Sequence, residues 1–172
     1  MSTTDIRTLG QLKEAGYQPR SIRDEMRANL VQAIRDRRNV FEGIIGYDHT
    51  VLPQVQRALL SRHDILFLGL RGQAKTRMAR MMTALLDEYV PVIDGAELHD
   101  DPLHPITVSG KTLVAEMGDD TPVTWLHRSE RYVEKLATPD VTVADLIGDV
   151  DPIKAVNEKL SFSDERVIQY GL

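Results

Sequence analysis

The chain has 172 residues, 42% of them hydrophobic and 27% charged, which is enough for one domain with a sizeable core. It contains no cysteine, so disulfides, thiol catalysis and cysteine-ligated zinc are excluded. It has neither a signal peptide nor an apolar run of membrane-spanning length, which predicts a cytoplasmic protein without a membrane partner.

Charge is divided unevenly along the chain. Residues 1–86 carry a balance of +6 and residues 87–172 a balance of −11, within a net charge of −5. A basic half suits an anionic ligand, although random drift of surface charge explains the asymmetry equally well. The acidic total and the lack of an aromatic–basic surface argue against nucleic-acid binding.

The chain before residue 64 predicts two helices. Polar residues and turn signals predict a loosely ordered segment at 1–18, ahead of a domain at 19–172. Ser21 has the pattern of a helix N-cap, and apolar residues recur behind it at four-residue spacing to about Arg38. A second helix is expected over 50–63.

The following stretch has the layout of a phosphate-binding loop. The apolar run Asp64–Leu68 predicts a strand, and it leads into Gly69-Leu70-Arg71-Gly72-Gln73-Ala74-Lys75-Thr76 and then into a predicted helix. Small residues let backbone N–H groups surround phosphate oxygens, while the lysine reaches the terminal phosphates and the threonine hydroxyl can ligate Mg²⁺. The alternative is a glycine turn that binds nothing.

One residue departs from the usual pattern, which has glycine where this chain has Ala74. Alanine resists a positive φ angle, so we expect Ala74 to adopt a helical or extended conformation.

Beyond the loop, Val90–Ile93 predicts a strand, and 106–124 predicts a small β excursion within a β-rich insertion at about 95–130. A further strand is expected over 131–136. His99, Asp100, Asp101 and His104 are of metal-ligating types, but their spacing defines no geometry, so a solvated acidic loop is favoured.

The Ile44-Ile45-Gly46 turn, the helix and apolar run after it, and the segment Gly69–Arg77 together resemble the MoxR and magnesium-chelatase I-subunit branch of the AAA+ ATPases. Members often carry alanine at the position of Ala74. The resemblance extends from about Tyr17. It implies an α/β fold with a P-loop NTPase-type parallel sheet flanked by helices, as part of an AAA+ large subdomain.

The same resemblance implies binding of ATP and Mg²⁺. Backbone N–H groups from Gly72 to Arg77 would surround phosphate, Lys75 would contact the β and γ phosphates, and Thr76 would hold Mg²⁺. The upstream turn would lie near the adenine. The implied nucleotide-binding residues are Gly69, Leu70, Arg71, Gly72, Gln73, Ala74, Lys75, Thr76, Arg77, Ile44, Ile45 and Gly46.

In a complete chain the resemblance implies ATP hydrolysis that drives remodelling or metal-insertion chaperone work. It also implies a homo-oligomeric ring and a partner with a von Willebrand A domain. Hydrolysis needs an apolar strand ending in Asp-Glu, and the nearest segment, Val92-Ile93-Asp94, lacks the second acid. We therefore expect an N-terminal part of the ATPase core that is inactive alone, with the catalytic acid and arginine finger beyond residue 172.

Two other functions remain open from the sequence. The chain could be a non-catalytic interaction or assembly module that uses nucleotide structurally. It could also be a different P-loop enzyme, such as a kinase, although no acceptor site is evident.

Overall fold

A computed structural model describes residues 3–172 and divides them into two compact units. The loop-bearing unit comprises Gly16–Val90 and Trp125–Tyr132. The second unit comprises the described residues up to Ala15 together with Pro91–Thr124 and Val133–Leu172.

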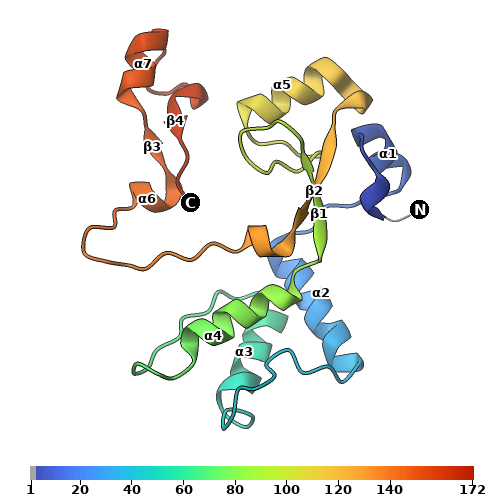
Figure 1. Ribbon diagram of the computed structural model, residues 1–172, viewed down its shortest axis with the longest axis vertical. Coiled ribbons are helices and arrows are strands. Elements are labelled where there is room, and N and C mark those ends of the chain that lie inside the picture. The colour runs from blue at the N-terminus through green and yellow to red at the C-terminus, as the bar shows by residue number, and fades with distance from the viewer. Residues whose placement is uncertain (1–2) are drawn as a thin grey trace. The chain divides into compact units, whose positions relative to one another are not determined.

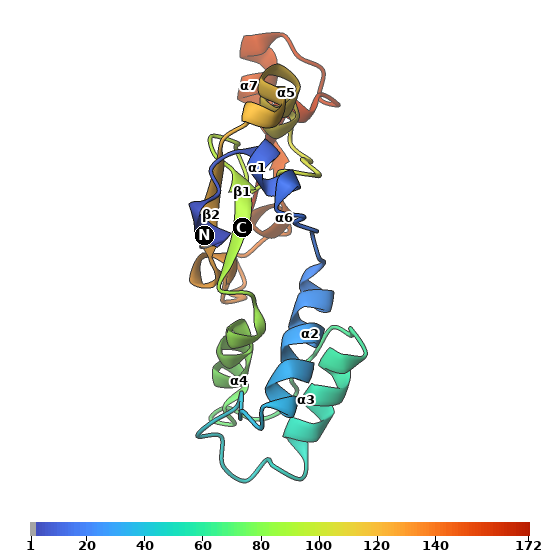
Figure 2. The same cartoon turned by 90° about the vertical axis from the view of Figure 1, so that its right-hand side faces the viewer.

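Helices are the main regular elements of the loop-bearing unit. They are α2 (Ile22–Arg35), α3 (Val51–Leu60) and α4 (Lys75–Met81), which the 3-10 turn η2 (Met82–Leu85) follows. Figures 1 and 2 show α2 and α3 side by side. The N-cap of α2 is confirmed, because the Ser21 hydroxyl accepts a hydrogen bond from the Asp24 N–H at 3.1 Å.

One hydrophobic cluster holds these helices together. Side chains from α2, α3, α4, η2 and the turn before α3 are almost fully removed from solvent, which is the main favourable contribution to folding. The buried members are Leu30, Ala33, Val40, Phe41, Ile44, Leu52, Val55, Leu59, Met78 and Leu85.

The run Asp64–Leu68 is extended but is not a β-strand. Ile65 and Phe67 pack against the hydrophobic cluster, whereas Leu66 and Leu68 are 81% and 83% exposed. Among residues 3–172, no backbone group of Ile65–Leu68 forms a hydrogen bond. The alternating burial is that of a strand, but no neighbouring strand pairs with it.

The expected P-loop NTPase-type parallel sheet is wrong. Within the described residues, β1 (Tyr89–Ile93) pairs with β2 (Val123–His127), and β3 (Asp149–Val150) pairs with β4 (Ile168–Gln169). The β3–β4 pair is antiparallel. The β1–β2 pair is antiparallel as well, because the Asp94 N–H donates to the Pro122 carbonyl at one end and the Arg128 N–H donates to the Glu88 carbonyl at the other.

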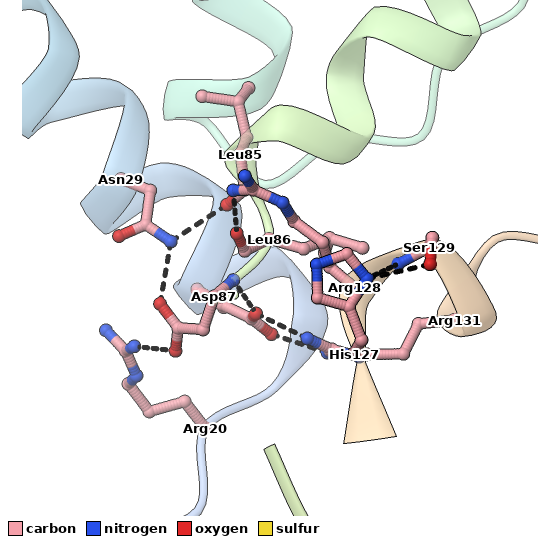
Figure 3. Close-up of polar contacts among 10 residues, drawn as sticks. Arg20, Asn29, Leu85, Leu86, Asp87, His127, Arg128, Ser129 and Arg131 are labelled. Atoms are coloured by element: carbon pink, nitrogen blue, oxygen red, sulfur yellow. Dashed lines mark hydrogen bonds and ion pairs between the residues drawn. The ribbon is translucent and has the colours of Figure 1, made fainter. Parts of the chain in front are cut away.

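A polar network fastens the η4 turn (Arg128–Arg131) to α2 within the loop-bearing unit (Figure 3). Glu25 is 2% exposed, and its carboxylate accepts two hydrogen bonds from the Arg131 guanidinium, at 2.6 and 2.7 Å. The Asp87 N–H donates to the same carboxylate. This pairing raises the pKa of Arg131, so the guanidinium keeps its charge although it is largely buried.

Asn29 and Arg20 extend the network (Figure 3). The Asn29 amide donates to the Leu85 carbonyl at 2.9 Å and to the Asp87 carboxylate at 2.8 Å, and Arg20 forms an ion pair with Asp87. The chain after η2 is therefore held to α2 by several polar groups whose hydrogen bonds are satisfied.

The second unit begins with the turn η1 (Thr3–Asp5) and α1 (Leu9–Glu14), on which Leu9 and Leu12 are buried. The N–H of Leu9 donates to the Thr121 carbonyl at 3.0 Å. Its remaining helical elements are α5 (Val108–Met117), η3 (Gly118–Asp120), α6 (Ala144–Ile147), α7 (Pro152–Glu158) and η5 (Glu165–Val167).

The expected β-rich insertion is wrong too, because α5 occupies most of 106–124. Thr107 begins this helix as its N-cap, since its hydroxyl accepts from the Gly110 N–H at 3.0 Å. The segment 131–136, another expected strand, contains no strand in the structure. No helix in the part of the chain that the structure describes is both long and apolar enough to cross a membrane.

The Glu25–Arg131 pair makes a testable contribution to stability. Replacing Arg131 with alanine leaves the Glu25 carboxylate buried without its charged partner, so the free energy of unfolding should fall by about 3 kcal/mol. Urea denaturation measures this change. Arg166→Ala is the control, because the Arg166–Asp164 pair lies at the surface and its loss should leave the urea midpoint unchanged. Equal midpoints for both variants would contradict the buried pair.

Candidate functional site

The loop before α4 surrounds an open hollow of about 520 Å³. Its lining contains three cationic side chains, Arg71, Lys75 and Arg77, and no acidic one. The full lining is Arg71, Gly72, Gln73, Ala74, Lys75, Thr76 and Arg77. The structure thus brings together most of the loop residues that the sequence predicted to bind phosphate, and it gives the hollow a positive lining.

Lys75 folds back across the loop. Its ammonium group donates hydrogen bonds to the carbonyl oxygens of Gly69, at 2.9 Å, and Leu70, at 2.5 Å. These two carbonyls hold the Lys75 ammonium group over the loop that precedes α4. A phosphate oxygen at the same place would be a stronger acceptor, since it carries a negative charge.

The backbone of the loop turns through two positive φ angles. Gly72 has φ 79°, which glycine adopts readily. Ala74 has φ 56° and ψ 16°, in the left-handed region, so the expected helical or extended conformation is wrong. The alanine forms the N-cap of α4 without a side-chain hydrogen bond. Its Cβ makes this conformation unfavourable by about 1 kcal/mol.

The turn Ile44-Ile45-Gly46 divides between core and surface. Ile44 belongs to the hydrophobic cluster, whereas the side chain of Ile45 is 91% exposed. The turn adjoins α4, because a Cβ added to Gly43 would lie 2.8 Å from a guanidinium nitrogen of Arg77. An exposed apolar side chain and a cation of the loop are therefore carried by neighbouring segments of the same unit.

A second Lys-Thr pair, in Gly110-Lys111-Thr112, was missed in the sequence, where the letters Gly-Lys-Thr could have drawn attention to it. It lies within α5, whose first turn already holds a carboxylate. Asp100 is 2% exposed and accepts hydrogen bonds from the N–H and hydroxyl of Thr107. A Cβ on Gly110 would lie 2.1 Å from this carboxylate, so no room for phosphate remains.

The burial of Asp100 also corrects the expected solvated acidic loop at 99–104. This carboxylate is an internal acceptor that closes the loop onto α5, while His99 and His104 are exposed. No group of three or more His, Asp or Glu side chains among residues 3–172 could hold a metal ion.

Comparison with protein-family models finds no match to this chain, and comparisons with curated proteins and with solved structures find none either.

The left-handed conformation of Ala74 predicts that Ala74→Gly stabilises the protein. Glycine adopts this φ without the Cβ penalty, so the free energy of unfolding should rise by about 0.5–1 kcal/mol after the entropy cost of glycine. Thermal or urea unfolding measures the change. Ala79→Gly in α4 is the matched control and should destabilise by about 1 kcal/mol. A loss of stability in both variants would contradict the positive φ of Ala74.

Proposed function

We propose that the loop Gly69–Arg77 binds the phosphate groups of ATP with Mg²⁺. The observation that carries this proposal is the hollow lined by Arg71, Lys75 and Arg77 without an acidic side chain. Neither the Arg71 nor the Arg77 side chain forms an ion pair or hydrogen bond among the described residues. Cations that are not neutralised by neighbouring carboxylates favour a multiply charged anion.

Lys75 would exchange its two carbonyl acceptors for oxygens of the terminal phosphates. The exchange keeps the ammonium hydrogen-bonded in both states, and charge-assisted bonds to phosphate are stronger than bonds to neutral carbonyls. Thr76 is exposed at the start of α4, where its hydroxyl would serve as a Mg²⁺ ligand. Backbone N–H groups from Gly72 to Arg77 would complete the phosphate contacts.

Ile45 supports the choice of a nucleotide over a simple phosphate. A side chain that is 91% exposed, in a turn beside Arg77, offers an apolar surface to a flat nucleobase. Ile44 would act indirectly, because it anchors the turn in the hydrophobic cluster. Gly46, with φ 83°, allows the chain to turn away immediately afterwards.

The resemblance to the MoxR branch extends the proposal to a complete chain. There, ATP hydrolysis would drive remodelling or metal-insertion chaperone work in a homo-oligomeric ring, with a von Willebrand A-domain protein as partner. Its support is the sequence of the loop, including Ala74, and of the upstream turn. The antiparallel strand pairs do not support this extension of the proposal.

Removal of the Lys75 ammonium tests phosphate binding. Lys75→Ala should weaken Mg-ATP binding by about 1.5–3 kcal/mol, or roughly 10- to 150-fold, because a charged hydrogen-bond donor is lost. Isothermal titration calorimetry with Mg-ATP measures this effect. Lys111→Ala is the matched control, since Lys111 also precedes a threonine but lies in α5. The phosphate-binding assignment would be contradicted if Lys75→Ala bound Mg-ATP with wild-type affinity, or if both variants lost affinity equally.

Replacement of Ile45 tests the position of the base. Ile45→Ser should weaken ATP binding about fivefold, since roughly 1 kcal/mol of apolar contact is lost, and should leave the affinity for inorganic triphosphate unchanged. Calorimetric titrations with the two ligands separate base from phosphate contacts. Ile153→Ser, at an exposed isoleucine of α7, is the control. If triphosphate binding fell by the same factor, Ile45 would not contact a base.

A further inference from the structure

We propose that Arg77 is a specificity-determining residue of the loop, whose guanidinium contacts the phosphate that is attached to the ribose. This role rests on the nucleotide-binding function proposed above, and it gives the site a reason to prefer nucleotides over inorganic polyphosphate. The Arg77 side chain extends from α4 to the upstream turn. A Cβ added to Gly43 would lie 2.8 Å from a guanidinium nitrogen of Arg77, so this cation fills the space beside the Gly43 backbone.

Buried neighbours fix the backbone on both sides of this contact. Met78 follows Arg77 in α4, Ile44 follows Gly43 in the turn, and both buried side chains belong to the hydrophobic cluster. Consecutive Cα atoms are about 3.8 Å apart, so the Ile45 Cα lies within about 7.6 Å of the Gly43 Cα. The Arg77 guanidinium is therefore close to the exposed apolar residue that the proposed function assigns to the base.

The other two cations of the hollow are associated with the beginning of the loop. The Lys75 ammonium donates to the Leu70 carbonyl at 2.5 Å, and Arg71 directly follows Leu70 in the chain. A nucleotide has its base at one end and its terminal phosphate at the other, and its first phosphate is attached to the ribose between them. With the base at Ile45 and the terminal phosphate at Lys75, the first phosphate falls beside Arg77.

The Arg77 guanidinium has the chemistry that this contact needs. Its planar fork can donate two parallel hydrogen bonds to a phosphate. Within residues 3–172 its side chain has no hydrogen-bond or ion-pair partner, although the acidic residue Glu42 precedes Gly43, so binding breaks no existing interaction. Contacts to the base and to the first phosphate reinforce each other, because the second contact forms within a complex that already exists. Inorganic triphosphate lacks the base and loses this advantage.

Calorimetric titration of single variants with ATP and with AMP tests the role. Arg77→Ala should weaken the binding of both nucleotides about tenfold, because both carry the first phosphate and a charged donor is lost. Arg71→Ala should weaken ATP binding far more than AMP binding, since AMP has no terminal phosphate. Arg35→Ala is the control for net charge, because this exposed arginine of α2 lies outside the hollow, and it should retain both affinities.

Two outcomes of these titrations would overturn the role of Arg77. One is a loss of ATP affinity in Arg77→Ala with unchanged AMP affinity, which would place the guanidinium at the terminal phosphate. The other is an equal loss in Arg77→Ala and Arg35→Ala, which would be an effect of net charge. A wild-type chain that binds neither nucleotide would overturn the nucleotide-binding function itself, and the role of Arg77 with it.

Photolabelling of the unmodified chain supplies a second measurement, which does not depend on the folding of a variant. ATP with a photoreactive azide on its base should label the tryptic peptide 39–57, which contains the turn around Ile45. ATP with an azidoanilide on its terminal phosphate should label the tryptic peptide 63–71, which contains Leu70. Exchanged labels would overturn the contact between Arg77 and the first phosphate but not nucleotide binding. Labelling that excess ATP fails to suppress would overturn nucleotide binding.

Discussion

The loop-bearing unit depends on an ion pair between residues that are 106 positions apart in the chain. Glu25 and Arg131 meet in a bidentate arrangement from which solvent is almost excluded, and the Asp87 N–H satisfies the carboxylate further. Two charges removed from water are tolerated only when such partners are present. The pair therefore specifies where the η4 turn must lie against α2, in addition to any stability that it contributes.

The phosphate-binding loop uses the rigidity of this unit. Helix α4 is anchored through Met78 in the hydrophobic cluster, and the segment before the loop is anchored through Ile65 and Phe67. The loop itself, between these anchors, is largely exposed and has three cations over an open hollow. Binding loops are commonly exposed segments positioned by a packed scaffold, and this arrangement is consistent with the proposed binding of a nucleotide.

The second unit also contains a Lys-Thr pair, but its structural surroundings differ from those of the loop. Its Gly110-Lys111-Thr112 segment resembles the loop in letters, but the Asp100 carboxylate already occupies the first turn of α5. One Lys-Thr pair therefore lines an open hollow. The other lies within α5, whose first turn already binds the Asp100 carboxylate. Short sequence motifs of this kind acquire a function only from the backbone around them.

The sequence by itself determined the features that depend on neighbouring residues. The N-cap at Ser21, helices α2 and α3, the start of α4 and the strand β1 follow from caps and periodicities of a few residues, and they were predicted close to their observed bounds. The grouping of the loop residues around one hollow follows from the same local order.

Only the tertiary structure decided the features that join distant residues. The apolar run Asp64–Leu68 predicted a strand, but a strand also needs a neighbour, and none within residues 3–172 pairs with it. The burial of Asp100 depends on the approach of α5, and the left-handed Ala74 on the path between two anchored segments. The physical reason is that backbone pairing and burial are decided by contacts far apart in sequence, which local patterns do not encode.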